Sequence, residues 1–429
     1  MKIKDDLEQQ GPIRVAVVGA GLMGTGLVAQ LLKIKGMEPV LWASRNADGL
    51  QQKLEDLGLA YDAFVDAKTI DAAKAARSRG EIALTTENRL AWEWAAVDVI
   101  VDCTGNTEAG AEINEYGLEN GKHIVSLNVE CDVLLGPYFL KKAREKGLCY
   151  TGTAGDEPGS IMELYEFADF LGFDIVCAGK GKNNPLRTDA TPEELAEEAA
   201  KKGISPRMLT SFVDGTNTMI ELNAVSNATG LVPDVFGCHG IEADIHGLKR
   251  EARQKEDGGR FSKKGVVEFV HGIAPGVFVA VKTDDEVIRR EMPYLSMGEG
   301  PSYILYRPYH LTNIETPMTI AKAVLYQEPT IAPTKGYIAH TVAIAKRAIK
   351  KGETLGGIGS DAVYGKITEA AHCYGEGLVP VGLITEGAVA KRDIAAGHLL
   401  TFADVVLDEE TKLVEMFRCE HEDFYSLPN

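Results

Sequence analysis

Two lysines stand in a short segment whose composition suits neither a helix nor a strand interior. Residues 179–185 read Gly-Lys-Gly-Lys-Asn-Asn-Pro, so a single glycine separates Lys180 from Lys182. Ammonium and amide groups at this density are typical of a clamp for an anion or a carbonyl group. We therefore predict that Lys180 and Lys182 are catalytic, either as donors to a developing alkoxide or as an acid.

Carboxylates occur on both sides of this clamp. Residues 155–159 read Gly-Asp-Glu-Pro-Gly, which places Asp156 and Glu157 side by side in a turn that does not pack a core. They are either solvated turn residues or ligands. With help from Glu130 or Asp214, their oxygens suit Mg²⁺ or Mn²⁺. We predict Asp156 and Glu157 as metal ligands, and Glu157 and Asp214 as catalytic residues, the latter as base or ligand. An alternative metal group without any standard spacing is Cys238, His239, Asp244 and His246.

Basic residues gather farther along the chain. Residues 249–264 contain seven Lys and Arg against three Asp and Glu, and they include Gly258 and Gly259. The stretch is either a lid that recruits a phosphorylated substrate or a solvated basic loop. His310, which follows Arg-Pro-Tyr, is either a proton donor or a structural histidine.

A glycine-rich turn near the N-terminus indicates a dinucleotide site. The β-formers at 15–18 precede Gly-x-Gly-x-x-Gly, and apolar residues at helical spacing follow. The three glycines would allow a tight turn, the approach of a pyrophosphate and close packing of helix on strand. The free N–H groups of the helix N-terminus would bind the phosphates. The cofactor-binding residues predicted here are Gly19, Gly21, Leu22, Met23 and Gly24.

The next strand predicts which dinucleotide is bound. It ends at Ser44 and Arg45, where an NAD enzyme usually has an Asp or Glu for the ribose hydroxyl. A hydroxyl and a guanidinium suit a 2′-phosphate, so NADP(H) is predicted. Two later buried strands end near Thr104, Gly105 and Asn128, which are candidates for the nicotinamide neighbourhood or ordinary turn residues.

Composition sets limits on the class of protein. The chain has 429 residues, 45% of them hydrophobic, and a formal net charge of -18. This acidity argues against nucleic acid or an anionic membrane as the main partner. The seven cysteines form no CxxC pair, and we find neither a signal segment nor a stretch long enough to span a membrane. We expect a cytoplasmic protein.

The predicted fold is α/β with three domains. Residues 1–154 would form a Rossmann domain with a doubly wound sheet, and residues 155–334 a central α/β domain for catalysis and oligomerisation. Residues 335–429 would form a small β-rich domain, because 345–355 and 390–400 match at six positions as an internal repeat. Apolar helical stretches in the central domain favour a homodimer.

The order of the motifs resembles homoserine dehydrogenase. In that family a later helix carries G-x-D-x-x-x-K with a further glycine nine residues on, and here Gly215 and Gly230 keep the register. The catalytic Asp and Lys of the family fall on Asn217 and Glu221, so the resemblance implies the fold but not activity on homoserine.

A closer resemblance is to homoserine-dehydrogenase-like proteins with a C-terminal SAF domain, a group that includes bacterial deoxyxylulose 5-phosphate reductoisomerase-like (DRL) enzymes. The supporting motifs lie at 128–132, 155–159, 179–185, 212–216 and 307–310. The resemblance implies metal-assisted rearrangement and NADPH reduction of a phosphorylated keto-sugar, in the isoprenoid precursor pathway. The alternatives are an NADP-dependent dehydrogenase of a sugar acid, a polyol or a homoserine-like substrate, and a nicotinamide-nucleotide sensor without turnover.

Overall fold

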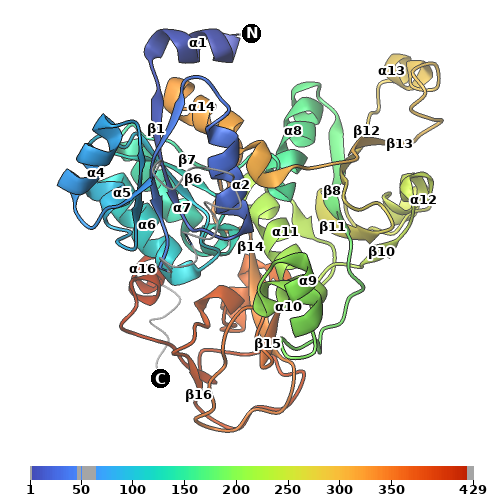
Figure 1. Ribbon diagram of the computed structural model, residues 1–429. Helices are drawn as coiled ribbons and strands as arrows, with labels where there is room; N and C mark the ends of the chain where they lie inside the picture. Colours follow the sequence, from blue (N-terminus) through green and yellow to red (C-terminus); the bar gives the residue numbers. More distant parts are fainter. Residues whose placement is uncertain (1, 46–49, 51–63, 423–429) are drawn as a thin grey trace. The chain divides into compact units, whose positions relative to one another are not determined.

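The computed structural model describes residues 2–45, 50 and 64–422 (Figure 1). The chain divides into two compact units. Unit 1 comprises Met1–Asp156, Leu311–Ala332 and Thr411–Glu420. Unit 2 comprises Glu157–His310, Pro333–Glu410 and His421–Asn429.

Unit 1 is built on a seven-stranded sheet with the strand order β3-β4-β2-β1-β5-β6-β7. Every described pairing in it is parallel. Its strands are β1 Ile13–Val18, β2 Met37–Ala43, β3 Phe64–Asp66, β4 Ile82–Thr85, β5 Val99–Asp102, β6 His123–Ser126 and β7 Tyr150–Gly152. Most of β1, β2, β5 and β6 is buried, as expected for a parallel sheet covered on both faces. The predicted Rossmann sheet is confirmed.

Helices surround this sheet, and two of them come from distant parts of the chain (Figure 1). The helices of unit 1 are α1 Lys2–Gln10, α2 Leu22–Leu31, α4 Ile70–Ser78, α5 Leu90–Glu93, α6 Thr107–Glu119, α7 Val129–Glu145, η3 Thr312–Ile314, α14 Thr316–Tyr326 and α16 Lys412–Glu420. The domain boundaries predicted from the sequence place α14 in the second domain and α16 in the third. Ile320, Ala321 and Ala323 of α14 instead pack into the core of unit 1.

The glycine turn after β1 is shaped by contacts that leave no room for side chains. Gly19 has a φ of +110°, and a Cβ on Gly24 would lie 2.0 Å from the carbonyl oxygen of Gly19. A Cβ on Gly21, in contrast, would meet nothing within 4 Å. Gly24 therefore serves packing, whereas Gly21 leaves space above the turn.

This difference gives a matched pair of variants. Gly24→Ala should destabilise the protein by about 1–3 kcal/mol, because an extra methyl group in a tightly packed site forces the backbone to shift. Gly21→Ala should cost about 1 kcal/mol or less, because a methyl group there meets no atom within 4 Å, and should weaken dinucleotide binding instead. Urea denaturation and nucleotide titration of both variants measure these effects. Equal stability of the two variants would contradict the packing role of Gly24.

Unit 2 contains a six-stranded mixed sheet with the order β10-β11-β8-β12-β13, in which β9 also pairs with β11. β8 runs parallel to β11 and antiparallel to β12. The strands are β8 Asp174–Lys182, β9 Val232–Pro233, β10 Ile241–Glu242, β11 Val266–His271, β12 Val277–Lys282 and β13 Ser302–Arg307. The helices are α8 Glu157–Phe170, α9 Ala196–Lys202, α10 Pro206–Val213, α11 Thr216–Thr229, α12 Ile245–Glu251, η2 Lys255–Asp257 and α13 Glu286–Glu291. The strand β8, which carries the predicted lysine clamp, thus lies inside the sheet.

The C-terminal part of unit 2 contains two small antiparallel sheets. Its elements are β14 Ala339–Ala345, β15 Val363–Glu369, α15 Ala370–Gly375, η4 Val381–Leu383, β16 Val389–Ala390 and β17 Val405–Val406. The two copies of the internal repeat pair with each other, because Ile349 and Ile394 exchange backbone hydrogen bonds. Gly352 and Gly397, at equivalent positions of the repeat, both have positive φ. The assignment of this region as a SAF domain stays a prediction.

All seven cysteines are free thiols. None of the described helices combines the length and the apolar character that crossing a bilayer requires.

Candidate active site

The glycine turn of unit 1 is held at the carboxyl end of β2. The Gly19 N–H donates to the Ala43 carbonyl at 2.8 Å, and the Trp42 indole donates to the Gly19 carbonyl at 3.0 Å. The turn therefore lies beside the residues that follow Ala43, which are Ser44 and the exposed Arg45. Helix α2 begins at Leu22 and Met23 with no side-chain cap, so its first N–H groups are available to an anion. The space above Gly21 and these donors fit a dinucleotide.

A buried carboxylate organises the next two loops of unit 1. Asp102, at the end of β5, accepts from the Thr104 hydroxyl at 2.6 Å and from the Asn128 amide at 2.9 Å. Asn128 is fully buried, and its Oδ1 also caps α7. The polar atoms of the Asn128 side chain thus hold the two loops together, and its predicted contact with the cofactor stays a prediction. Gly105 lies exposed between them with positive φ. Asp102 was not predicted as a site residue.

In unit 2, alternation along β8 places both lysines of the clamp on one face. Lys180 and Lys182 are 4% and 5% exposed. Gly179 and Gly181, which alternate with the lysines, lie close to the backbone of neighbouring segments. A Cβ on Gly179, for example, would lie 2.0 Å from the Glu268 carbonyl oxygen. The Gly-Lys-Gly-Lys pattern is thus a strand packed tightly on one face with two ammonium groups on the other.

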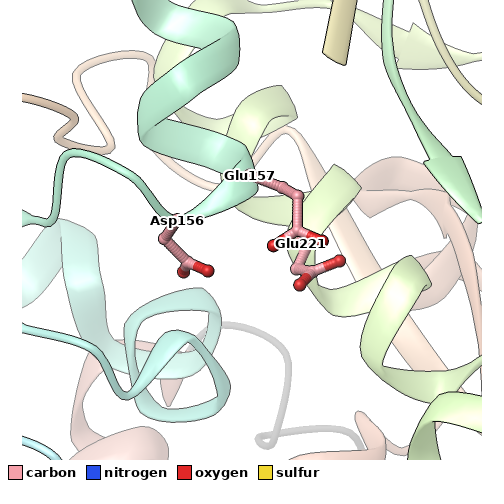
Figure 2. A group of neighbouring side chains, drawn as sticks. All are labelled: Asp156, Glu157 and Glu221. Atoms are coloured by element: carbon pink, nitrogen blue, oxygen red, sulfur yellow. The ribbon is translucent and has the colours of Figure 1, made fainter. Parts of the chain in front are cut away.

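Lys180 lies between two carboxylates of unit 2. Its Nζ donates to Glu157 at 2.6 Å and also to Glu221 of α11. Asn217, one turn earlier on α11, donates to the other oxygen of Glu221 at 2.8 Å. His310 Nε2 lies 3.5 Å from Glu157. Figure 2 shows the carboxyl groups of Glu157 and Glu221 turned toward each other. Asn217 and Glu221, which replace the homoserine dehydrogenase pair, therefore belong to one charged network with Lys180.

The charges of this network are set by burial and by each other. Burial alone would lower the pKa of Lys180, but Glu157 and Glu221 outweigh it and raise the pKa above its ordinary value. Burial, and then the negative charge of Glu157, raise the pKa of Glu221. Burial opposes ionisation of Glu157, yet the Lys180 and His310 charges hold its pKa below the usual range. Lys180 therefore stays an ammonium ion, and Glu221 is the carboxyl group that takes up a proton more readily.

One ligand oxygen each of Asp156, Glu157 and Glu221 lies within 4.8 Å of the others, close enough to share a metal ion, but Lys180 already pairs with both glutamates. Both oxygens of Glu221 and one oxygen of Glu157 already accept hydrogen bonds, and Lys180 supplies the positive charge there. Asp156 is the residue before Glu157 in the chain and the last residue of the first segment of unit 1. We assign no chemical step to a metal ion.

Lys182 differs from Lys180 in its electrostatic environment. Its Nζ donates to the Phe212 carbonyl at 2.5 Å and forms no ion pair with a carboxylate in the described part of the chain. Burial, and then the positive charge of Lys180, lower the pKa of Lys182 to about 8. Lys182 can therefore gain and lose a proton near neutral pH, which Lys180 cannot.

Asp214 is engaged in an ion pair that the sequence analysis missed. Its carboxylate lies 2.8 Å from the Lys346 Nζ and accepts the Thr216 N–H at 2.9 Å. Lys346, which follows β14, also donates to the carbonyls of Ala190 and Ser360, both at 2.7 Å. Burial raises the pKa of Asp214, against the Lys346 charge. Asp214 was predicted as a base or metal ligand. In the structure it joins α10 to the C-terminal region, because its charge is matched by Lys346.

A cavity of about 630 Å³ lies in unit 2 beside Lys182 and Asp214. Its lining comes from the ends of β8 and β11, the start of α11, the loop before β10, and β15. The polar and aromatic lining residues are Lys182, Asn183, Thr188, Asp214, His239, Glu242, Phe269, His271, Tyr364 and Lys366. The last two belong to the region predicted as a separate C-terminal domain.

Two other predicted groups have partners of their own in unit 2. In the basic stretch, Arg260 pairs with Glu251, Lys263 with Glu369 and Lys264 with Asp174. Three of its seven cations are thus matched by carboxylates within unit 2, and its role as a phosphate lid stays a prediction.

The Cys238–His246 group is likewise dispersed. His239 contacts Asp234 at 2.7 Å, and Asp244 caps α12 through the Gly247 N–H. Cys238 lies against the Val267 carbonyl. These side chains therefore have separate structural partners, and they do not form a metal-ligand group within the described residues.

Two family models match the chain. Residues 19–148 match the NAD binding domain of homoserine dehydrogenase, and residues 155–316 match the catalytic domain of oxidoreductase DRL. The chain is therefore an oxidoreductase with a nucleotide-binding dehydrogenase domain. Within that class, it has the homoserine dehydrogenase-like and DRL domains on which the predicted resemblance depends.

No curated protein matches the chain. Among solved structures, scyllo-inositol dehydrogenase from Lactobacillus casei with NAD(H) and scyllo-inositol is 12% identical, with a TM-score of 0.38 over 69% of this chain and 76% of that one. A DOX-P reductoisomerase in complex with magnesium is 14% identical, with a TM-score of 0.41 over 74% of this chain and 70% of that one.

Proposed function

We propose that this oxidoreductase is an NADPH-dependent reductoisomerase of the deoxyxylulose 5-phosphate type, acting in isoprenoid precursor synthesis. The observation that supports it best is the buried lysine pair of β8, inside the segment that matches the DRL catalytic domain. One lysine is held as a permanent cation by two glutamates, and the other titrates near neutral pH. A rearranging ketose needs both, namely a fixed positive charge for developing oxyanions and a group that moves a proton.

In the proposed rearrangement, Lys180 and Lys182 of unit 2 would have different roles. The C3–C4 bond of the ketose breaks and a C2–C4 bond forms, so that C2 becomes an alkoxide and C3 an aldehyde. Lys182 gives its proton to the C2 oxygen and takes up the proton that the C3 hydroxyl loses, and Lys180 stabilises negative charge on the neighbouring oxygen. The nicotinamide, when bound, supplies a hydride to the aldehyde carbon. The aldehyde is reduced and NADPH is oxidised, with one proton taken up by the new alcohol.

Arg45 is the residue we expect to select NADPH. Arg45→Glu should lower the NADPH over NADH ratio of kcat/KM by about tenfold or more, because a hydrogen bond to a charged group is worth about 1.5–3 kcal/mol. Arg89→Glu changes the same charge on an exposed arginine that pairs with Glu93, and it should leave the ratio unchanged. Coenzyme titrations at fixed substrate give the ratios. An unaltered ratio in Arg45→Glu would refute this assignment.

The direct test of the proposal is NADPH oxidation with 1-deoxyxylulose 5-phosphate. We expect turnover, and we expect dialysis against EDTA to leave it unchanged, since Lys180 already pairs with Glu157 and Glu221. Loss of activity with EDTA and its return with Mn²⁺ would contradict the metal-free mechanism. No turnover on this substrate, with oxidation of a sugar acid or a polyol derivative by NADP⁺ instead, would replace the rearrangement by simple dehydrogenation.

A further inference from the structure

The cavity of unit 2 has a wall that neither the family matches nor the proposed chemistry explains. Strand β15 contributes Tyr364, Gly365 and Lys366 to the lining. It lies outside residues 155–316, which match the catalytic domain of oxidoreductase DRL. The strand is fixed in place, since Gly365 donates its N–H to the Thr216 hydroxyl at 2.8 Å. A Cβ on Gly365 would also lie 2.6 Å from the Thr341 methyl group.

Lys366 is held by its aliphatic chain, while its ammonium group pairs with no carboxylate of the described residues. Its aliphatic chain lies over Gly237, where a Cβ would be 2.7 Å from the lysine Cδ. Its Nζ lies 5.8 Å from the centre of the Phe236 ring. Within the part of the chain that the structure describes, Lys366 forms no ion pair. The packing therefore orders the side chain and leaves its ammonium group to a ligand.

The remaining charges of the lining add to this positive character. Lys182 donates only to a backbone carbonyl, whereas the Asp214 carboxylate is matched by Lys346. His271 also lines the cavity, and Glu242 is exposed. A cavity lined by two lysines that have no carboxylate partner among the described residues favours an anion over a neutral or cationic ligand.

We infer that Lys366 binds the phosphate monoester of the substrate, so that the C-terminal region supplies the anion subsite of the cavity. The inference rests on the proposed function for the identity of the substrate, but phosphate binding at this subsite can be measured without any catalytic turnover. It assigns phosphate recognition to β15 rather than to the basic stretch at 249–264, in which Arg260, Lys263 and Lys264 pair with carboxylates. The carboxylate of a sugar acid is also an anion that a lysine could bind, and the experiment below distinguishes it from a phosphate.

The test is calorimetric titration of the full-length chain without coenzyme, using inorganic phosphate and, separately, gluconate. Wild type should bind phosphate, and Lys366→Met, which keeps the stem over Gly237, should bind it at least tenfold more weakly. Lys263→Met removes the same charge from a lysine paired with Glu369, and it should bind as wild type does. Lys366→Arg should retain binding. Circular dichroism checks that each variant is folded.

Other outcomes would overturn the inference. It is wrong if wild type does not bind phosphate, if Lys366→Met binds phosphate as wild type does, or if gluconate binds and phosphate does not. None of these results depends on whether the chain catalyses a rearrangement. If turnover is found, Lys366→Met should raise KM for the phosphorylated substrate with little change in kcat.

Discussion

Lys182→Met should reduce NADPH oxidation by about 10²–10⁴-fold, the range typical of removing a general acid or base. The physical reason is that Lys182 is the buried amine of β8 that titrates near neutral pH, whereas Lys180 is fixed as a cation. NADPH affinity should be unchanged, since the dinucleotide residues belong to unit 1. Steady-state kinetics and fluorescence titration of NADPH separate these two effects.

The pH profile gives an independent check on the role of Lys182. If the lysine acts as an acid, its protonated form is the active one, so kcat/KM should fall as pH rises through about 8. This fall of kcat/KM with pH should be absent in Lys182→Met. Lys182→Arg should not restore the rate, because a guanidinium does not release its proton in this range. A rate that rises through pH 8 would mean that Lys182 acts as a base.

Removing the other lysine should affect stability more than any surface change. Lys180→Met leaves Glu157 and Glu221 buried without their cation, and the loss of one partner of a buried ion pair costs about 3–5 kcal/mol. Lys202→Met breaks an exposed pair with Glu198 and should cost no more than about 1 kcal/mol. Urea denaturation of both variants measures the difference.

A second substitution can confirm the cause of that loss. In Lys180→Met/Glu221→Gln only Glu157 remains as a buried carboxylate, so the double variant should recover part of the lost stability. If it is as unstable as the single variant, lost packing rather than unbalanced charge explains the effect.

The dinucleotide domain could be predicted from the sequence because its signals are local. One short stretch contains the buried strand, the three glycines of the turn and the following helix. The packing of Gly24 against Gly19 follows from the spacing of these glycines. Arg45 could be identified in the same way, because it lies two residues after the end of β2. The hydrogen bond between Asn128 and Asp102 could not be predicted in this way, because the two residues lie 26 positions apart in the chain.

The partners of the lysines could not be predicted from spacing. Glu157 and Glu221 are 23 and 41 residues from Lys180, and only the packing of α8 and α11 on the sheet brings them together. The sequence motif therefore indicated two equivalent lysines. The fold makes one a fixed cation and leaves the other free to titrate.

The role of the C-terminal region was missed for a similar reason. Its internal repeat predicts a small β-rich structure, and two repeat units do pair through Ile349 and Ile394. The repeat does not predict which parts of unit 2 contact β14 and β15. Lys346 and Lys366 lie in this region, and their contacts with Asp214 and with the cavity depend on the packing of β14 and β15 against α11.

The most direct test of the proposed rearrangement is the proton NMR spectrum of the product formed from 1-deoxyxylulose 5-phosphate and NADPH. Migration of C4 to C2 before reduction places the methyl group on a carbon that bears no hydrogen, so we predict a methyl singlet distinct from that of the ketone substrate. Reduction of the ketone without rearrangement places the methyl group next to a CH–OH, and a methyl doublet would contradict the reductoisomerase account.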